Sequence, residues 1–270
     1  AQMASLSNDQ IAKLGTQQAQ SLTTTQLNAL SADQVAAVET ADIAALTTAQ
    51  LSGLSTASAQ ALTSAQVTAL SSTQLQSLSS AQLNALDTAD VRAMGTSQIQ
   101  ALTTAQLSQM QTDKIAALST TQVAKLAATQ LAALSSTQLA AMQTDDLKQL
   151  GTAQLGYLNQ NIFGGMGTAQ VANMGTAQIA ALGGLQVKQL STANIKALTS
   201  DQVKALSAAA VQSLSSAQVA ALDTVDVAQL STGQIRALSN GGLSGLTTAQ
   251  VNNMGTQQVA AFSAEQLKVL

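Results

Sequence analysis

The chain has 270 residues and a net charge of −3, and only 9% of its residues are charged. It contains one Tyr and two Phe, and it lacks Trp, Pro, His and Cys. Without Cys it forms no disulfides or thiolate metal sites, and without a basic stripe or stacking aromatic residues we expect no nucleic-acid binding. No apolar run approaches the roughly 18 residues of a membrane span, so we expect no spanning segment.

Apolar residues make up 46% of the sequence, which is too many for a typical disordered chain. An ordinary globular core uses aromatic side chains to fill its wide centre. Here Leu, Val, Ile, Met and Ala supply almost all of the apolar side chains. We therefore expect a thin structure with a core one side-chain layer deep.

An eight-residue repeat runs from the first residues to the last, as in SSAQLNAL at 79–86. Stepping by eight from Leu83 gives an apolar residue every time, and a second apolar column lies three residues later, at Leu86. The residue before the first column is usually Gln, as at Gln82. No insertion or deletion breaks this frame, so we predict a single continuous octapeptide-repeat array over residues 1–270, with no linker.

One long helix does not fit this repeat, because eight residues advance about 80° beyond two full turns and the apolar stripe would wind around the helix. A β-solenoid fits less well than short helices, because columns three residues apart face opposite sides of a strand. A corner between the two columns would remove that objection, so the β-solenoid stays as an alternative.

One short helix per octad fits best. Ser71 and Gln74 form a capping box at the start of the octad 71–78, and Leu70 and Leu75 form a hydrophobic staple. We expect about seven helical residues after each cap. In some octads the next residue, a Thr, is an alternative cap that would move the start by one, as at Thr88, Thr96 and Thr152.

Helices this short are not stable alone, so neighbouring octads must stabilise one another. The predicted fold class is an all-α solenoid of very short helices, one per 8-residue repeat. Positions in the Gln column that hold another residue recur at multiples of 16, as at Asp42, Ser58 and Asp90. From this spacing we predict two repeats per coil.

Catalysis is not expected, because the usual nucleophile and base pairs need His or Cys and the many Ser and Thr are explained by capping. We predict no enzyme, no cofactor and no metal site. The acidic pairs Asp145-Asp146 and Asp87/Asp90 are Ca²⁺ candidates, but Asp at a helix start is the more common arrangement.

Two further patterns each allow two interpretations. Lys188, Lys196 and Lys204 share one slot in successive octads, as a docking strip or as a solvated face, and the solvated face is the commoner case. The Gln column is either a ligand-binding ladder or a set of caps and inter-coil hydrogen bonds, and we favour the second.

The most irregular stretch is 156–166, which holds the only Tyr, one of the two Phe and two adjacent glycines. We interpret Tyr157, Asn159 and Phe163 as a contact site or a kink, and drift within a redundant array is the alternative.

The first residues are already repeat-like, so we expect any targeting segment to have been removed or to lie elsewhere. Solenoids normally close their ends with polar repeats, whereas the last residue here is Leu270. We expect either a piece of a longer array or units that join end to end, with a second copy of the chain as the partner.

Octads such as GTAQIAAL at 175–182 resemble tracts of very large repetitive bacterial surface and secreted proteins. That resemblance implies an extracellular or cell-surface location. The predicted function is a non-enzymatic structural protein, an extended repeat rod that serves as an extracellular filament subunit or an adhesin stalk. The alternative is a β-solenoid binding module that presents Thr ladders to ice or glycan, with Thr40, Thr48 and Thr56 as examples.

Overall fold

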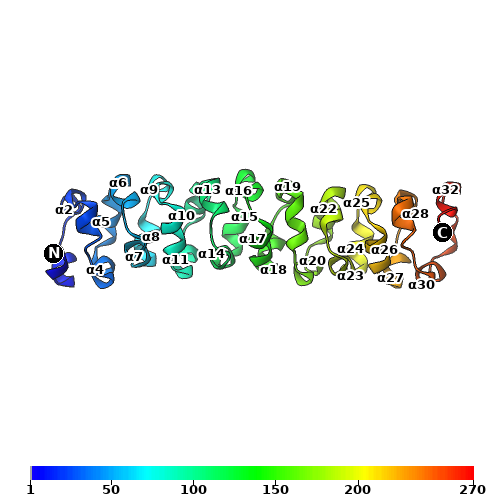
Figure 1. Cartoon of the computed structure of the whole chain (residues 1–270), viewed down its shortest axis with the longest axis horizontal. Coiled ribbons are helices and arrows are strands. Elements are labelled where there is room, and N and C mark those ends of the chain that lie inside the picture. The colour runs from blue at the N-terminus through cyan, green and yellow to red at the C-terminus, as the bar shows by residue number, and fades with distance from the viewer. Residues whose placement is uncertain (1) are drawn as a thin grey trace. The chain divides into compact units, whose positions relative to one another are not determined.

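The computed structural model describes residues 2–270, and a short helix begins at every eighth residue from Asn8 onward (Figure 1). The α-helices span four to six residues, fewer than the seven expected from the octad. They end early because the second-column residue leaves the helix: Leu78 has φ −69° and ψ 137°, which is extended backbone. Its amide closes the last turn by donating to the Leu75 carbonyl at 3.2 Å.

The described residues form two compact units, which meet in the sequence at Ala133 and Leu134. In the first unit, all elements except the 3₁₀ helix η1 are α-helices. Their bounds are η1 Met3–Ser5, α1 Asn8–Ile11, α2 Thr16–Ser21, α3 Thr24–Leu27, α4 Ala32–Ala37, α5 Thr40–Ala45, α6 Thr48–Ser52, α7 Thr56–Gln60, α8 Ser64–Ala69, α9 Ser72–Ser77, α10 Ser80–Ala85, α11 Thr88–Ala93, α12 Thr96–Ala101, α13 Thr104–Ser108, α14 Thr112–Ala117, α15 Thr120–Ala124 and α16 Ala128–Ala132.

The second unit continues the same frame, and one of its octads forms a 3₁₀ helix, η2, in place of an α-helix. The bounds are α17 Ser136–Ala141, α18 Thr144–Gln149, α19 Thr152–Tyr157, η2 Gln160–Gly165, α20 Thr168–Ala172, α21 Thr176–Ala181, α22 Gly184–Gln189, α23 Thr192–Lys196, α24 Ser200–Ala205, α25 Ala208–Ser213, α26 Ser216–Ala221, α27 Thr224–Val227, α28 Thr232–Ala237, α29 Asn240–Leu243, α30 Thr248–Asn252, α31 Thr256–Val259 and α32 Ala264–Leu267.

The all-helical fold class is confirmed, and the β-solenoid alternative is wrong because residues 2–270 contain no strand. The predicted cap is also confirmed: Ser71 is the N-cap of α9, and its hydroxyl accepts from the Gln74 amide. The alternative caps are not used. Thr88, Thr96 and Thr152 are the first helical residues of their octads.

Each coil contains three octads, so the prediction of two repeats per coil is wrong. Within the first unit α5 packs on α8 and α8 packs on α11, and within the second α22 packs on α25 and α25 packs on α28. Figure 1 shows α22, α25 and α28 side by side. Three short helices joined by extended links enclose a closed interior, whereas two would face each other without one.

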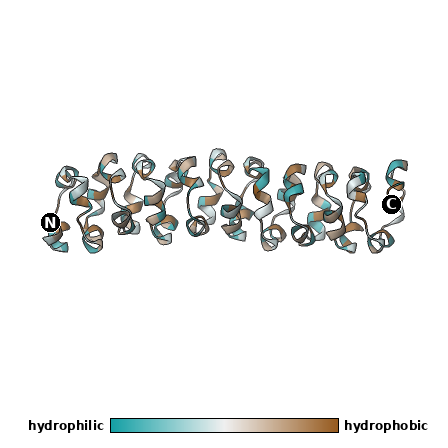
Figure 2. Ribbon diagram, viewed as in Figure 1, coloured by the Kyte–Doolittle hydropathy of each residue, from teal (hydrophilic) through white to brown (hydrophobic). Residues whose placement is uncertain are grey.

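The core of each unit is formed by the two apolar columns, which point from the helices into the coil. Leu75, Leu83 and Leu107 are fully buried, and so are most of their equivalents. In Figure 2 the short helices carry both brown apolar and teal polar segments, as expected for elements with one covered face. Small aliphatic side chains fill this interior, in agreement with the thin core predicted from composition.

The packing between coils is close enough to test with a glycine. A Cβ atom built on Gly245, which follows α29, would lie 2.0 Å from the Ser216 carbonyl oxygen of α26. We expect Gly245→Ala to lower the free energy of unfolding by about 1–3 kcal/mol, as overpacking does. Gly241→Ala, in an open position of α29, is the matched control and should raise it by up to about 1 kcal/mol. Equal effects in urea denaturation would contradict the close approach.

Candidate functional site: the glutamine joints and the aromatic segment

The Gln column forms a joint between coils, as Gln106 shows. Its side-chain oxygen Oε1 accepts from the Thr103 backbone amide at 2.8 Å, and its own amide N–H donates to Thr103 Oγ1 at 3.1 Å. Its side-chain nitrogen Nε2 donates to the carbonyl oxygens of Leu75 and Leu78 at 2.9 and 2.7 Å. One buried side chain therefore caps its own helix and binds the carboxyl end of the helix four octads earlier.

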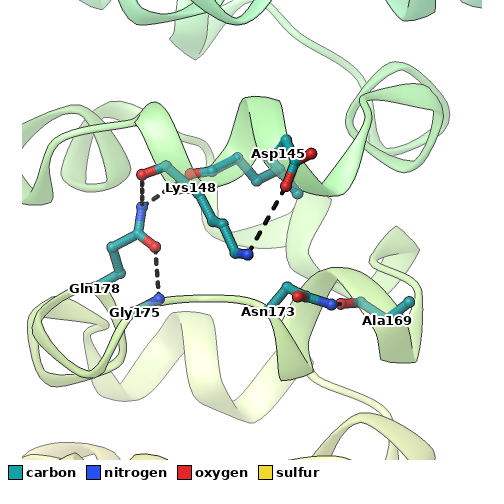
Figure 3. Close-up of polar contacts among 7 residues, drawn as sticks. Asp145, Lys148, Ala169, Asn173, Gly175 and Gln178 are labelled. Atoms are coloured by element: carbon teal, nitrogen blue, oxygen red, sulfur yellow. Dashed lines mark hydrogen bonds and ion pairs between the residues drawn. The ribbon is translucent and has the colours of Figure 1, made fainter.

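The same joint recurs in both units. In Figure 3, Gln178 lies between the Gly175 amide and carbonyl oxygens of the preceding coil, with Nε2 to Leu150 O at 2.7 Å. The prediction that the Gln column caps helices and joins coils is confirmed. The residues whose Nε2 reaches the carbonyls both 28 and 31 positions earlier are Gln34, Gln50, Gln66, Gln82, Gln98, Gln106, Gln122, Gln130, Gln170, Gln178, Gln202, Gln218, Gln234, Gln250, Gln258 and Gln266.

Two asparagines that sequence reasoning missed take over part of the joint where Gln is absent. Ser58 occupies the Gln slot of α7, and Asn28 Oδ1 accepts from the Ser55 amide at 2.7 Å in place of a glutamine. Lys114 occupies the slot of α14, and Asn84 Oδ1 accepts from the Gln111 amide at 2.8 Å. Each asparagine precedes the altered slot by 30 residues, which is a signal once the length of a coil is known.

The acidic pairs act as helix-start residues. Asp90 Oδ2 accepts from the Asp87 amide at 2.9 Å, and its Oδ1 accepts from the Ser64 hydroxyl at 2.6 Å. Asp145 lies 3.8 Å from the Lys148 ammonium, as Figure 3 shows. In the part of the chain that the structure describes, no three Asp or Glu side chains are grouped to hold a metal ion.

Asp42 is the exception among these acids. It fills the Gln slot of α5 and is 2% exposed, and its Oδ2 is the one buried side-chain oxygen or nitrogen without a hydrogen-bond partner among residues 2–270. Burial raises the pKa of its carboxyl group above the usual value, and the nearby Glu39 carboxylate raises it further. The slot was built for a donor, and a carboxylate supplies none.

The aromatic segment does not converge on one site. Tyr157 ends α19 and is 51% exposed, whereas Phe163 lies in the first apolar column and is fully buried. Asn159 is the N-cap of η2, and its Oδ1 accepts from the Asn161 amide at 3.0 Å. Ile162 fills the Gln slot and is buried. The segment thus changes the local helix type, and the predicted contact role of Tyr157 stays a prediction.

The lysines and threonines do not form strips. Lys188, Lys196 and Lys204 lie on the successive helices α22, α23 and α24, so they occupy the three sides of a coil. A docking strip of these lysines is therefore wrong. Thr40, Thr48 and Thr56 begin α5, α6 and α7 and are likewise one per side, which leaves no ladder on a flat face.

A family described as the ALTTAQ repeat matches residues 35–72, 83–120, 139–183, 171–216, 219–256 and 227–264, well over half of the chain. No curated protein matches the sequence at a significant level. Among the helices of residues 2–270, none is long and apolar enough to cross a membrane.

Loss of one joint should be costly. In Gln106→Met the volume of the side chain is kept, but the Thr103 amide and the Leu75 and Leu78 carbonyls lose their partners. We expect the free energy of unfolding to fall by about 2–4 kcal/mol, because the cap and buried hydrogen bonds are lost together. Gln109→Met, on an exposed position of the same octad, is the control, and a loss of similar size there would refute the joint.

Asp42→Asn should repair its slot. The folded state holds the Asp42 proton more tightly than the unfolded state, so stability present below the usual Asp pKa is lost as the pH rises through the raised pKa. Asn194 shows the repair: its Oδ1 accepts from the Ser191 amide and its Nδ2 donates to Met166 O at 3.0 Å. We expect the variant to gain about 1 kcal/mol at pH 7 and to lose this pH dependence.

Stability measured in urea between pH 3 and 7 checks this expectation. Asp33→Asn, which removes an exposed acid from the start of α4, is the control and should leave the profile unchanged. A variant less stable than the parent at pH 7 would contradict the assignment.

Proposed function

We propose that this chain, which belongs to the ALTTAQ repeat family, is a non-enzymatic structural protein: a repeat rod that serves as an extracellular filament subunit or an adhesin stalk and self-associates end to end. The observation that carries the proposal is the glutamine joint. Each joint binds an octad to the one four octads earlier, so every coil is stabilised by its neighbours and the arrangement extends by repetition.

The surface chemistry of the helices supports a structural role. Ser, Thr and Asp side chains at the helix starts bind backbone amides of their own helix, and Gln side chains bind carbonyls of the next coil. These groups hold the chain in place and so account for the polar residues that composition supplies in excess. The location at the cell surface is proposed from the resemblance of the octads to repetitive surface and secreted proteins.

Electron microscopy of the purified 270-residue chain tests the proposal. We expect thin particles of constant width whose length grows with protein concentration, since end-to-end contacts follow mass action. Sedimentation velocity over the same concentrations should show a series of species rather than one. Compact particles of one size at all concentrations would overturn the proposal.

A further inference from the structure

We propose that copies of the chain stack head to tail in the octad frame, with Gln10, Gln18 and Gln26 of one copy bound to the carboxyl-terminal coil of the next. This inference rests on the proposed function, because it specifies the surfaces and the register of the self-association. The partner is a second copy of this chain.

The first surface consists of half-made joints. The Oε1 atoms of Gln10, Gln18 and Gln26 each accept from the backbone amide of their own N-cap at 2.8 Å, as at every other joint. Their Nε2 groups meet no acceptor among the described residues, and the side chains are exposed. Gln34, the next in the column, is buried and donates to Leu6 O at 2.6 Å. The donors of the first coil are therefore preorganised by their caps and point to a missing neighbour.

The second surface offers the matching acceptors. Gln266 is the last residue in the column, and it fills the carbonyls of Ile235 and Leu238. The carbonyls at the equivalent places of α30, α31 and α32 receive no glutamine from residues 2–270. They belong to Val251 and Met254, Val259 and Phe262, and Leu267 and Leu270.

Apolar side chains are uncovered on the same two surfaces. Val259 is 45% and Leu267 is 52% exposed, whereas Ile235, which fills the same slot one coil or more earlier, is fully buried. On the first surface the second-column residues Leu6, Leu14 and Leu22 are half-buried, while later members of that column are buried. Contact between the two surfaces would bury both sets and exclude water from the new hydrogen bonds.

The register follows from the spacing of the joint. In the units, Nε2 reaches the carbonyls 31 and 28 positions earlier, at the first and second apolar columns of one octad. Continuing this relation from one copy to the next pairs Gln10 with Val251 and Met254, Gln18 with Val259 and Phe262, and Gln26 with Leu267 and Leu270. All three donors then meet acceptors in the same order as within a unit.

The testing variant is Gln10→Glu, Gln18→Glu and Gln26→Glu in one chain. Glu keeps the oxygen that caps the helix and is the usual capping-box partner, so α1, α2 and α3 keep their starts. It removes the Nε2 donors and places carboxylates against carbonyl oxygens. The matched control changes Gln109, Gln149 and Gln229, which are exposed and outside the column, to Glu, and so carries the same added charge.

At neutral pH we expect the first variant to sediment as a single species at concentrations where the parent and the control associate. Below the Glu pKa of about 4.3, protonated Glu donates again, and association of the variant should return. If the parent associates and the variant associates equally well, the joint is not the contact, while the proposed self-association stands. If the parent itself does not associate, both proposals fail.

A second variant, Val259→Glu with Leu267→Glu, blocks the other surface at positions that are already half exposed. Each blocked chain keeps one intact surface, so an equimolar mixture of the two variants should form a one-to-one dimer and nothing longer. Dimers of either variant alone, or no dimer in the mixture although both retain the helical circular dichroism of the parent, would overturn the head-to-tail arrangement.

Discussion

The structure depends on the two-sided hydrogen bonding of a glutamine amide. A helix of four to six residues leaves most of its backbone amides and carbonyls without intrahelical partners, and these groups must be satisfied when the coils pack. Gln106 satisfies an amide at the start of its own helix and two carbonyls at the end of another. Glutamate would cap as well but has no donor for the carbonyls, which explains why Gln fills a slot that capping alone leaves open to either residue.

Sequence alone predicted what is decided within one octad. The start of α9 after Ser71, its capping box with Gln74 and the burial of Leu75 follow from eight consecutive residues, and all were correct. The number of octads per coil is decided between octads, and the pattern used for it was ambiguous. Altered Gln slots recur 48 residues apart, which is divisible by both 16 and 24, as at Asp42 and Asp90, at Lys114, Ile162 and Ala210, and at Asp146, Asn194 and Gly242. Only the packing of α5 on α8 distinguishes the two periods.

The candidate site was less predictable because rarity in composition does not imply proximity in space. Tyr157 and Phe163 were grouped as unusual residues of one stretch, but the octad frame buries Phe163 and leaves Tyr157 outside. Asn28 and Asn84 went unnoticed because their role depends on a partner 30 residues away. That spacing becomes meaningful only when a coil is known to take 24 residues, so a single non-local parameter limited both the fold and the site.

Coupling between neighbouring coils also explains how the array accepts change. Each joint contributes separately, so a slot that loses its glutamine weakens one contact and leaves those on either side intact. Asn194 rebuilds both halves of the joint with a shorter side chain, Asp90 rebuilds the cap and recruits the Ser64 hydroxyl, and Ile162 replaces the polar contact with apolar burial. Because the acceptors are backbone carbonyls, any octad in frame offers the same partner whatever its side chains are. Stacking of this kind is therefore specified by the eight-residue spacing itself, and that spacing is the one feature of the sequence that no octad alters.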